Sequence, residues 1–328
     1  MYNNLNFQDS FRNSWEKHYV NAAKNMGADF LNYSYDKKSE ISKKWGSYLS
    51  EAARKWERKT RLKENQCAMF DALDNCFQQG YDHVINIDSD LILNSKSNIF
   101  KHCDIESVYC EHAYTDGIRD KGEWNWGRWM KIQQVLELGK DNEIDFQMSM
   151  FLESALKNKV FKYGNLGFVS IHKESWNKLR NYLVDPKSIM SQIKEKYHGL
   201  FFLMSDQAIL SAALTLSGVK LEQYKDVERL NMFVHFLEPF ISYYKIFYNI
   251  SEDYLQEIIK KHAPPGTKNK HARWIPLLYH YINSTQEKQD ALWPLSTGFL
   301  NLVKSHSSIS RELSKTKESL SLLSSLAK

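Results

Sequence analysis

The sequence has few cysteines, and none of them is arranged as a metal site. The four are Cys67, Cys76, Cys103 and Cys110, which form no Cys-x-x-Cys pair and match no common zinc spacing. No stretch approaches the roughly 18 apolar residues of a membrane span. Residues 1–4 have neither the basic nor the apolar part of a secretory signal. We therefore expect a soluble, cytoplasmic protein with reduced, structural thiols.

The chain also has little net charge. The formal value is +5 over 328 residues, which is too weak to indicate nucleic-acid binding but suits an anionic small-molecule partner. Hydrophobic residues make up 42% and charged residues 25% of the chain, as in ordinary globular proteins. The aromatic fraction of 13% fits a carbohydrate site and fits a packed core equally well.

The segment Asp88-Ser89-Asp90 carries the clearest sign of chemistry. A β-branched, apolar run at residues 84–87 predicts a buried strand that ends just before it. Ligands bind at the carboxyl ends of strands in open α/β sheets, and side chains two residues apart in an extended chain point the same way. Asp88 and Asp90 can therefore face one Mn²⁺ or Mg²⁺ ion. The alternative is an ordinary surface turn, in which Asp and Ser are common.

Helix and strand patterns alternate along the chain. Helices are predicted at residues 7–26, 50–79, 173–183, 208–216, 251–261 and after residue 276. Strands are predicted at residues 28–35, 84–87, 105–110, 168–171 and 232–236, and a loop at residues 37–46. This alternation favours a mainly parallel sheet covered by helices.

Two less regular segments suggest contacts at the periphery. Residues 112–145 contain Trp124, Trp126 and Trp129, which makes them a candidate wall for an acceptor pocket. Leucines in the Ser/Lys/Glu-rich residues 309–326 predict an amphipathic tail helix, which offers a contact for oligomers.

Two short motifs place polar groups next to predicted elements. Asn165 lies between Gly164 and Gly167, which permit the close approach of a ligand, although a plain turn explains them as well. Asp206 and Gln207 open a predicted helix, where Asp206 is equally suited to cap the N-terminus.

The order of these motifs resembles that of GT-A nucleotide-sugar glycosyltransferases. It is most similar to the retaining, glycogenin-like and galactosyltransferase-like branch, and the similarity covers roughly residues 10–270. The resemblance implies an α/β, GT-A-like (Rossmann-like), mostly parallel sheet flanked by helices at residues 1–240. A mainly helical C-terminal region at residues 241–328 would follow it. It also implies an apolar strand before the first helix, whereas residues 1–10 are polar apart from Tyr2, Leu5 and Phe7.

Carried over position by position, the resemblance assigns donor-binding roles. Asp90 would chelate the metal, and Asp88 would share the metal or the donor ribose, with Ser89 between them in the donor site. Asn165 and Gly167 would face the donor sugar.

The resemblance also implies a late metal ligand and a reacting centre. In that branch a metal-binding His is followed six residues later by a phosphate-binding Lys, and His262 and Lys268 have this separation. His235 is the competing third ligand. His262 is preferred, because a lone His in an apolar strand is more often a core residue. Asp206 and Gln207 would lie beside the reacting anomeric carbon.

These roles imply a metal-dependent transfer of sugar from a UDP- or GDP-sugar to a hydroxyl group of a glycan or small acceptor. Mn²⁺ or Mg²⁺ and Lys268 would stabilise the departing diphosphate. Asp206 or Gln207 would stabilise an oxocarbenium-like sugar, or Asp206 would act as the base of an inverting reaction. Sugar, nucleobase, acceptor and stereochemical outcome stay open.

Two other functions compete with this interpretation. One is a GT-A-like protein that binds sugars or nucleotides without turnover, which the polar residues 1–10 favour. The other is a haloacid-dehalogenase-like, Mg²⁺-dependent phosphatase. It is less favoured, because such a motif normally opens the domain and needs a late acidic pair.

Overall fold

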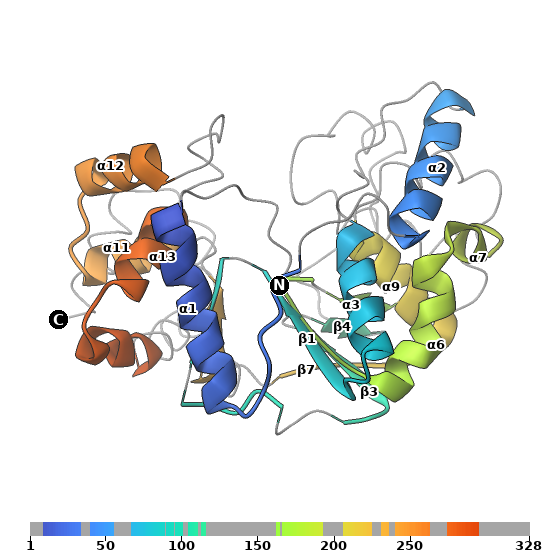
Figure 1. The fold of residues 1–328 in the computed structure, drawn as a ribbon, viewed down its shortest axis with the longest axis horizontal. Helices are drawn as coiled ribbons and strands as arrows, with labels where there is room; N and C mark the ends of the chain where they lie inside the picture. Colours follow the sequence, from blue (N-terminus) through green and yellow to red (C-terminus); the bar gives the residue numbers. More distant parts are fainter. Residues whose placement is uncertain are drawn as a thin grey trace, which may run out of the picture.

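A four-stranded sheet in the order β1-β6-β3-β7 lies between two groups of helices (Figure 1). The computed structural model describes residues 9–33, 40–55, 67–88, 90–94, 96–100, 104–110, 113–115, 162–164, 166–192, 206–224, 231–235, 240–262 and 274–294. The helices are α1 (Asp9–Asn25), α2 (Glu40–Lys55), α3 (Ala68–Gln78), α6 (Lys173–Val184), α7 (Pro186–Met190), α9 (Asp206–Ser217), α11 (Phe240–Phe247), α12 (Glu252–His262) and α13 (Trp274–Ile282). The strands are β1 (His83–Ile87), β2 (Leu91–Leu93), β3 (Ser107–Cys110), β4 (Ala113–Thr115), β5 (Lys162–Gly164), β6 (Phe168–His172), β7 (Lys220–Gln223) and β8 (Phe233–His235).

The central sheet is mixed. β6 pairs antiparallel with β1 and with β3, whereas β3 and β7 pair parallel. β1, β3 and β7 therefore share one direction, and β6 runs against them. The predicted α/β class is confirmed, but the pairings are not mostly parallel. The sequence does not reveal this, because an apolar run such as residues 168–171 has the same pattern in either direction.

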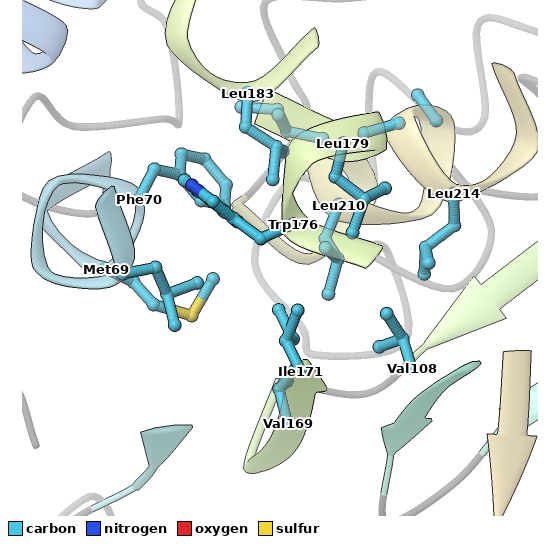
Figure 2. Packing of buried hydrophobic residues seen from close by; sticks show 14 of the residues in the cluster. Met69, Phe70, Val108, Val169, Ile171, Trp176, Leu179, Leu183, Leu210 and Leu214 are labelled. Carbon is cyan, nitrogen blue, oxygen red and sulfur yellow. The ribbon is translucent and has the colours of Figure 1, made fainter. Parts of the chain in front are cut away.

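Helices α3, α6 and α9 cover one face of the sheet. Alternate strand side chains, including Val108, Val169 and Ile171, point toward this face and meet Trp176 of α6 and Leu210 of α9 (Figure 2). Complete burial of such a side chain contributes about 1.5–3 kcal/mol. This layer therefore anchors the strand that precedes Asp88.

A second apolar cluster lies on the opposite side of the sheet. Phe168 of β6 stacks on Phe233 of β8, with ring centroids 4.2 Å apart. Phe11 and Trp15 of α1 and Leu277 of α13 belong to the same cluster. The small β2–β8 sheet is thus packed together with the first and the late helices.

Several predicted elements are confirmed with small shifts at their ends, namely α1, β1, β3, β6, α6, α9, β8 and α12. Gly27, with φ +72°, follows α1 in the left-handed conformation expected of a glycine that ends a helix. The described residues after 240 are mainly helical, in α11, α12 and α13. No helix in the described part of the chain is long and apolar enough to cross a membrane.

Two predictions near the N-terminus are wrong. The chain is helical from Glu40, where a loop is expected at residues 37–46, because Ile41 and Trp45 lie four residues apart and are buried. Residues 28–32 form no regular strand, and Tyr33 makes only an isolated bridge. The predicted long helix at residues 50–79 is described only as the end of α2 and as α3, since residues 56–66 lie outside the described part.

Candidate metal site

Asp88 and Asp90 flank the turn between β1 and β2. The N–H of Asp88 donates to the carbonyl of Gly167 at 2.8 Å, which extends the β1–β6 ladder by one residue. The N–H of Leu91 then donates to the carbonyl of Asp88 at 3.3 Å. The turn therefore holds both carboxylates at the carboxyl end of β1, where the sequence predicts them.

His235 reaches this turn through strand pairing. In the β2–β8 register, His235 lies opposite Leu91, the residue after Asp90. Its Nε2 atom lies 3.1 Å from Oδ1 of Asp90. Asp88, Asp90 and His235 each offer one ligand atom, and these atoms all lie within 4.8 Å of one another.

These spacings suit a six-coordinate divalent ion. At metal–ligand distances of about 2.1 Å, adjacent octahedral ligands lie about 3 Å apart and opposite ones about 4.2 Å apart. The separation of 3.1 Å between His235 and Asp90 matches an adjacent pair. Two carboxylates and one imidazole form a mixed oxygen and nitrogen donor set of the kind that binds Mn²⁺ and related ions. The residues present therefore fit the metal that the sequence predicts.

The three candidate ligands range from a buried side chain to an exposed one. The side chain of His235 is 6% exposed and that of Asp90 is 20% exposed, whereas Asp88 lies at the surface. A site with one buried and one open side can hold an ion firmly and still accept ligands from solvent.

Tyr19 of α1 is bonded to β2, directly after the turn that carries Asp90. This fully buried side chain donates its hydroxyl hydrogen to the carbonyl of Leu91. Burial, and then the negative charge of Asp90, raises the pKa of Tyr19 well above its ordinary value. Tyr19 therefore remains protonated and able to donate this hydrogen bond to Leu91.

His262, the preferred third ligand, lies in a different environment. It is 1% exposed at the end of α12 and stacks on Tyr279, with ring centroids 4.5 Å apart, beside Phe11. Neither ring nitrogen has a hydrogen-bond partner among the described residues, and burial lowers the pKa of His262. The structure thus places His235, and not His262, with the two aspartates.

The other predicted site residues are only partly placed. Gly167 contacts Asp88 through the backbone bond described above. Asp206 is the first residue of α9 and is half-buried, and the backbone of Gln207 follows it in the same helix. The side chain of Gln207 and the residues Ser89, Asn165 and Lys268 lie outside the described part, as do the tryptophans of residues 112–145 and the tail at residues 309–326.

A sequence signal for His235 exists but is weak. Phe233 and Val234 form a short apolar run that ends in a polar residue, and Leu91–Leu93 is a similar run that follows Asp90. Two such runs can pair, but their separation along the chain hides the register. No protein-family model, curated protein or solved structure matches this chain.

Proposed function

We propose that the protein is a metal-dependent glycosyltransferase that uses a nucleoside-diphosphate sugar, such as a UDP- or GDP-sugar. The observation that carries the proposal is the convergence of Asp88, Asp90 and His235 at the carboxyl end of β1, with ligand atoms within 4.8 Å. The order of motifs along the sequence supports it further. The cation is Mn²⁺ or Mg²⁺, and the acceptor is a hydroxyl group of a glycan or small molecule.

The geometry of the three ligands leaves room for a diphosphate. An octahedral ion held by three protein atoms keeps about three positions for other ligands. When bound, a divalent metal supplies positive charge where the departing diphosphate becomes negative. Asp88, the exposed member of the group, lies on the side from which a nucleotide can approach.

Asp206 is the described residue proposed for the sugar itself. In the proposed reaction its carboxylate stabilises positive charge on the anomeric carbon or takes the acceptor proton. Gln207 is proposed beside it, and Ser89, Asn165, Gly167 and Lys268 are proposed to hold the donor.

Thermal-shift measurements with UDP, GDP, CDP and dTDP, each with and without Mn²⁺, test the proposal. We expect one nucleotide to raise the melting temperature only when Mn²⁺ is present, and Asp90→Ala to abolish this shift. Release of nucleotide from the matching sugar donor should follow. Stabilisation without any turnover would favour a binding protein, and no stabilisation by any nucleotide would overturn the proposal.

A further inference from the structure

β2 and β8 form a two-stranded sheet that brings His235 to Asp90. Three residue pairs make up its ladder, and in one of them His235 lies opposite Leu91. A two-stranded sheet has little stability of its own. The contact between Nε2 of His235 and Oδ1 of Asp90 therefore depends on whatever fixes the register of these two strands.

The side-chain pattern of the two strands does not set this register. Every side chain of β2 and of β8 is buried, so neither strand has one apolar face and one polar face. Register is strongly specified where a single face is buried, and in a hairpin the turn sets it as well. β2 and β8 are distant in the sequence and share no turn. Contacts beyond the three pairs are therefore needed to fix the register.

A shift of register would separate the candidate ligands. A slip by one residue turns every side chain of β8 to the opposite face of the small sheet, and His235 turns with them. A slip by two residues restores the face but moves His235 by about 6.6 Å along the strand. The ligand atoms now lie within 4.8 Å of one another, so either slip removes His235 from the site.

Asn94, the residue after β2, holds the segment that leads into β8. Its backbone N–H donates to the carbonyl of Met232 at 2.8 Å, which continues the β2–β8 ladder. Its side-chain Nδ2 donates to the carbonyl of Asn231 at 2.7 Å. Two successive carbonyls before β8 are thus bonded to one residue. A slip of β8 would move both carbonyls away from these donors.

The turn after β2 fixes the orientation of the Asn94 side chain. Oδ1 of Asn94 accepts a hydrogen bond from the N–H of Lys96 at 3.0 Å. The backbone carbonyl of Asn94 accepts one from the N–H of Ser97, also at 3.0 Å. Asn94 is 9% exposed, and a buried amide is costly to leave without partners. The side chain is therefore held with its Nδ2 directed at Asn231.

We propose that Asn94 is a positioning residue of the metal site, because it fixes the β2–β8 register and so keeps His235 beside Asp90. The proposal rests on the metal site of the proposed function, but it does not depend on which nucleotide or acceptor is used. Tyr19 and Phe168 hold β2 and β8 individually, through the carbonyl of Leu91 and the ring of Phe233. Asn94 joins one strand to the other.

Pulsed electron paramagnetic resonance on bound Mn²⁺ tests the proposal, because it detects coupling to an imidazole nitrogen ligand. We expect this coupling in the parent protein. Asn94→Leu removes the side-chain amide bonds at similar size, and it should abolish the coupling and weaken Mn²⁺ binding about 10-fold. A merely structural role of Asn94 would lower stability without changing the ligands of the ion.

Ser97→Ala is the matched control. It removes a hydroxyl that donates to the same carbonyl of Asn231, at 2.6 Å, and it should leave the coupling and the Mn²⁺ affinity unchanged. If Asn94→Leu does not fold, Asn94→Asp takes its place, because it keeps the acceptor for Lys96 but lacks the N–H that donates to Asn231. Intact coupling and an affinity within about twofold of the parent in a folded Asn94 variant would overturn the proposal.

A second measurement, on the metal-free protein, separates the role of Asn94 from the existence of the metal site. Because Asn94 bonds to Met232, alternation along the ladder makes Leu91 and His235 a non-hydrogen-bonded pair. The Cα atoms of such a pair lie about 4.5 Å apart, and their α-protons give a strong nuclear Overhauser effect. This effect should be present in the parent and absent in the Asn94 variant, and its persistence there would overturn the proposal. Failure of the parent to bind Mn²⁺ would refute the proposed function, whereas the α-proton contact would still decide whether Asn94 fixes the register.

Discussion

Nε2 of His235 lies 3.1 Å from Oδ1 of Asp90, although 145 residues separate them in the sequence. If both atoms bind one ion, His235→Ala removes a direct ligand and should lower Mn²⁺ affinity by about 100-fold or more, since even indirect partners of metal ligands contribute about 10–100-fold. Isothermal titration calorimetry with Mn²⁺ measures this.

The matched control is His262→Leu, which removes the other candidate imidazole from an aromatic environment. It should leave Mn²⁺ affinity within about twofold of the parent protein. A larger loss in His262→Leu than in His235→Ala would return the third-ligand role to His262.

The hydroxyl of Tyr19 offers a second, indirect test of the site. Tyr19→Phe keeps the packing but removes the bond to the carbonyl of Leu91, which loosens the turn that carries Asp90. Mn²⁺ affinity should fall about 10-fold. Tyr244→Phe is the control, because it removes a buried hydroxyl that contacts His280 at 3.0 Å in the same cluster. Equal losses of affinity in the two variants would indicate general loosening of the core and would refute the role of Tyr19.

The ion pair between α3 and α6 should contribute to stability independently of the site. Asp74 is buried and accepts two bonds from Arg180, at 2.5 and 3.0 Å, as well as one from the indole of Trp176 at 3.3 Å. Asp74→Ala leaves these donors without their acceptor and should lower the free energy of unfolding by about 2–3 kcal/mol in urea titrations. Asp290→Ala breaks a more exposed pair with Lys96 and should change the free energy of unfolding far less, because solvent screens exposed ion pairs. Similar losses in both variants would contradict this assignment.

The buried His18 should lower the free energy of unfolding at acidic pH. Burial lowers its pKa to about 4, from an ordinary value of 6.5, and its enclosed Nε2 atom has no hydrogen-bond partner in the part of the chain that the structure describes. Between pH 6.5 and 4 the unfolded chain binds a proton that the folded chain does not. Above pH 6.5 both states are neutral at His18, and the free energy of unfolding has its full value. As the pH falls from 6.5 toward 4, protonation of the unfolded chain lowers this free energy.

Urea unfolding at pH 7 and 4.5, compared between the parent protein and His18→Gln, isolates this contribution from that of His83, whose pKa is also lowered to about 4. It should be about 2 kcal/mol. His18→Gln should reduce the pH dependence by that amount, whereas Lys17→Gln, an exposed change one residue away, should not. An unchanged pH dependence in His18→Gln would show that other groups cause it.

The local sequence pattern predicts the two aspartates of the candidate site, whereas His235 is brought to them by the pairing of two strands that are distant in the sequence. The apolar run before Asp88 predicts both β1 and the position of the carboxylates, because burial and side-chain alternation both follow from the pattern of neighbouring residues. The partnership of Asp90 with His235 depends on the register of β2 against β8. No property of either short strand alone fixes that register, and this is why His262, with its suggestive spacing to Lys268, is the more attractive candidate from sequence.

The early helices show a related limit. Ile41 and Trp45 are the buried face of α2, but the charged residues around them resemble a loop. Their apolar partners come from α3 and α6, so the helix is stabilised by contacts that its own sequence does not contain.

The packing of α1 against α13 also governs when the protein can acquire its site during synthesis. α1 is made before the other described helices, yet its apolar face belongs to a cluster that extends to Trp293. Until those late residues emerge, Phe11, Trp15 and Tyr19 lack most of their final contacts, and Tyr19 has no stable base from which to hold the turn. Contacts so distant in sequence form slowly, and exposed apolar surface invites aggregation in the interval. The turn that carries Asp88 and Asp90 can therefore take its final form only after the late helices have been made.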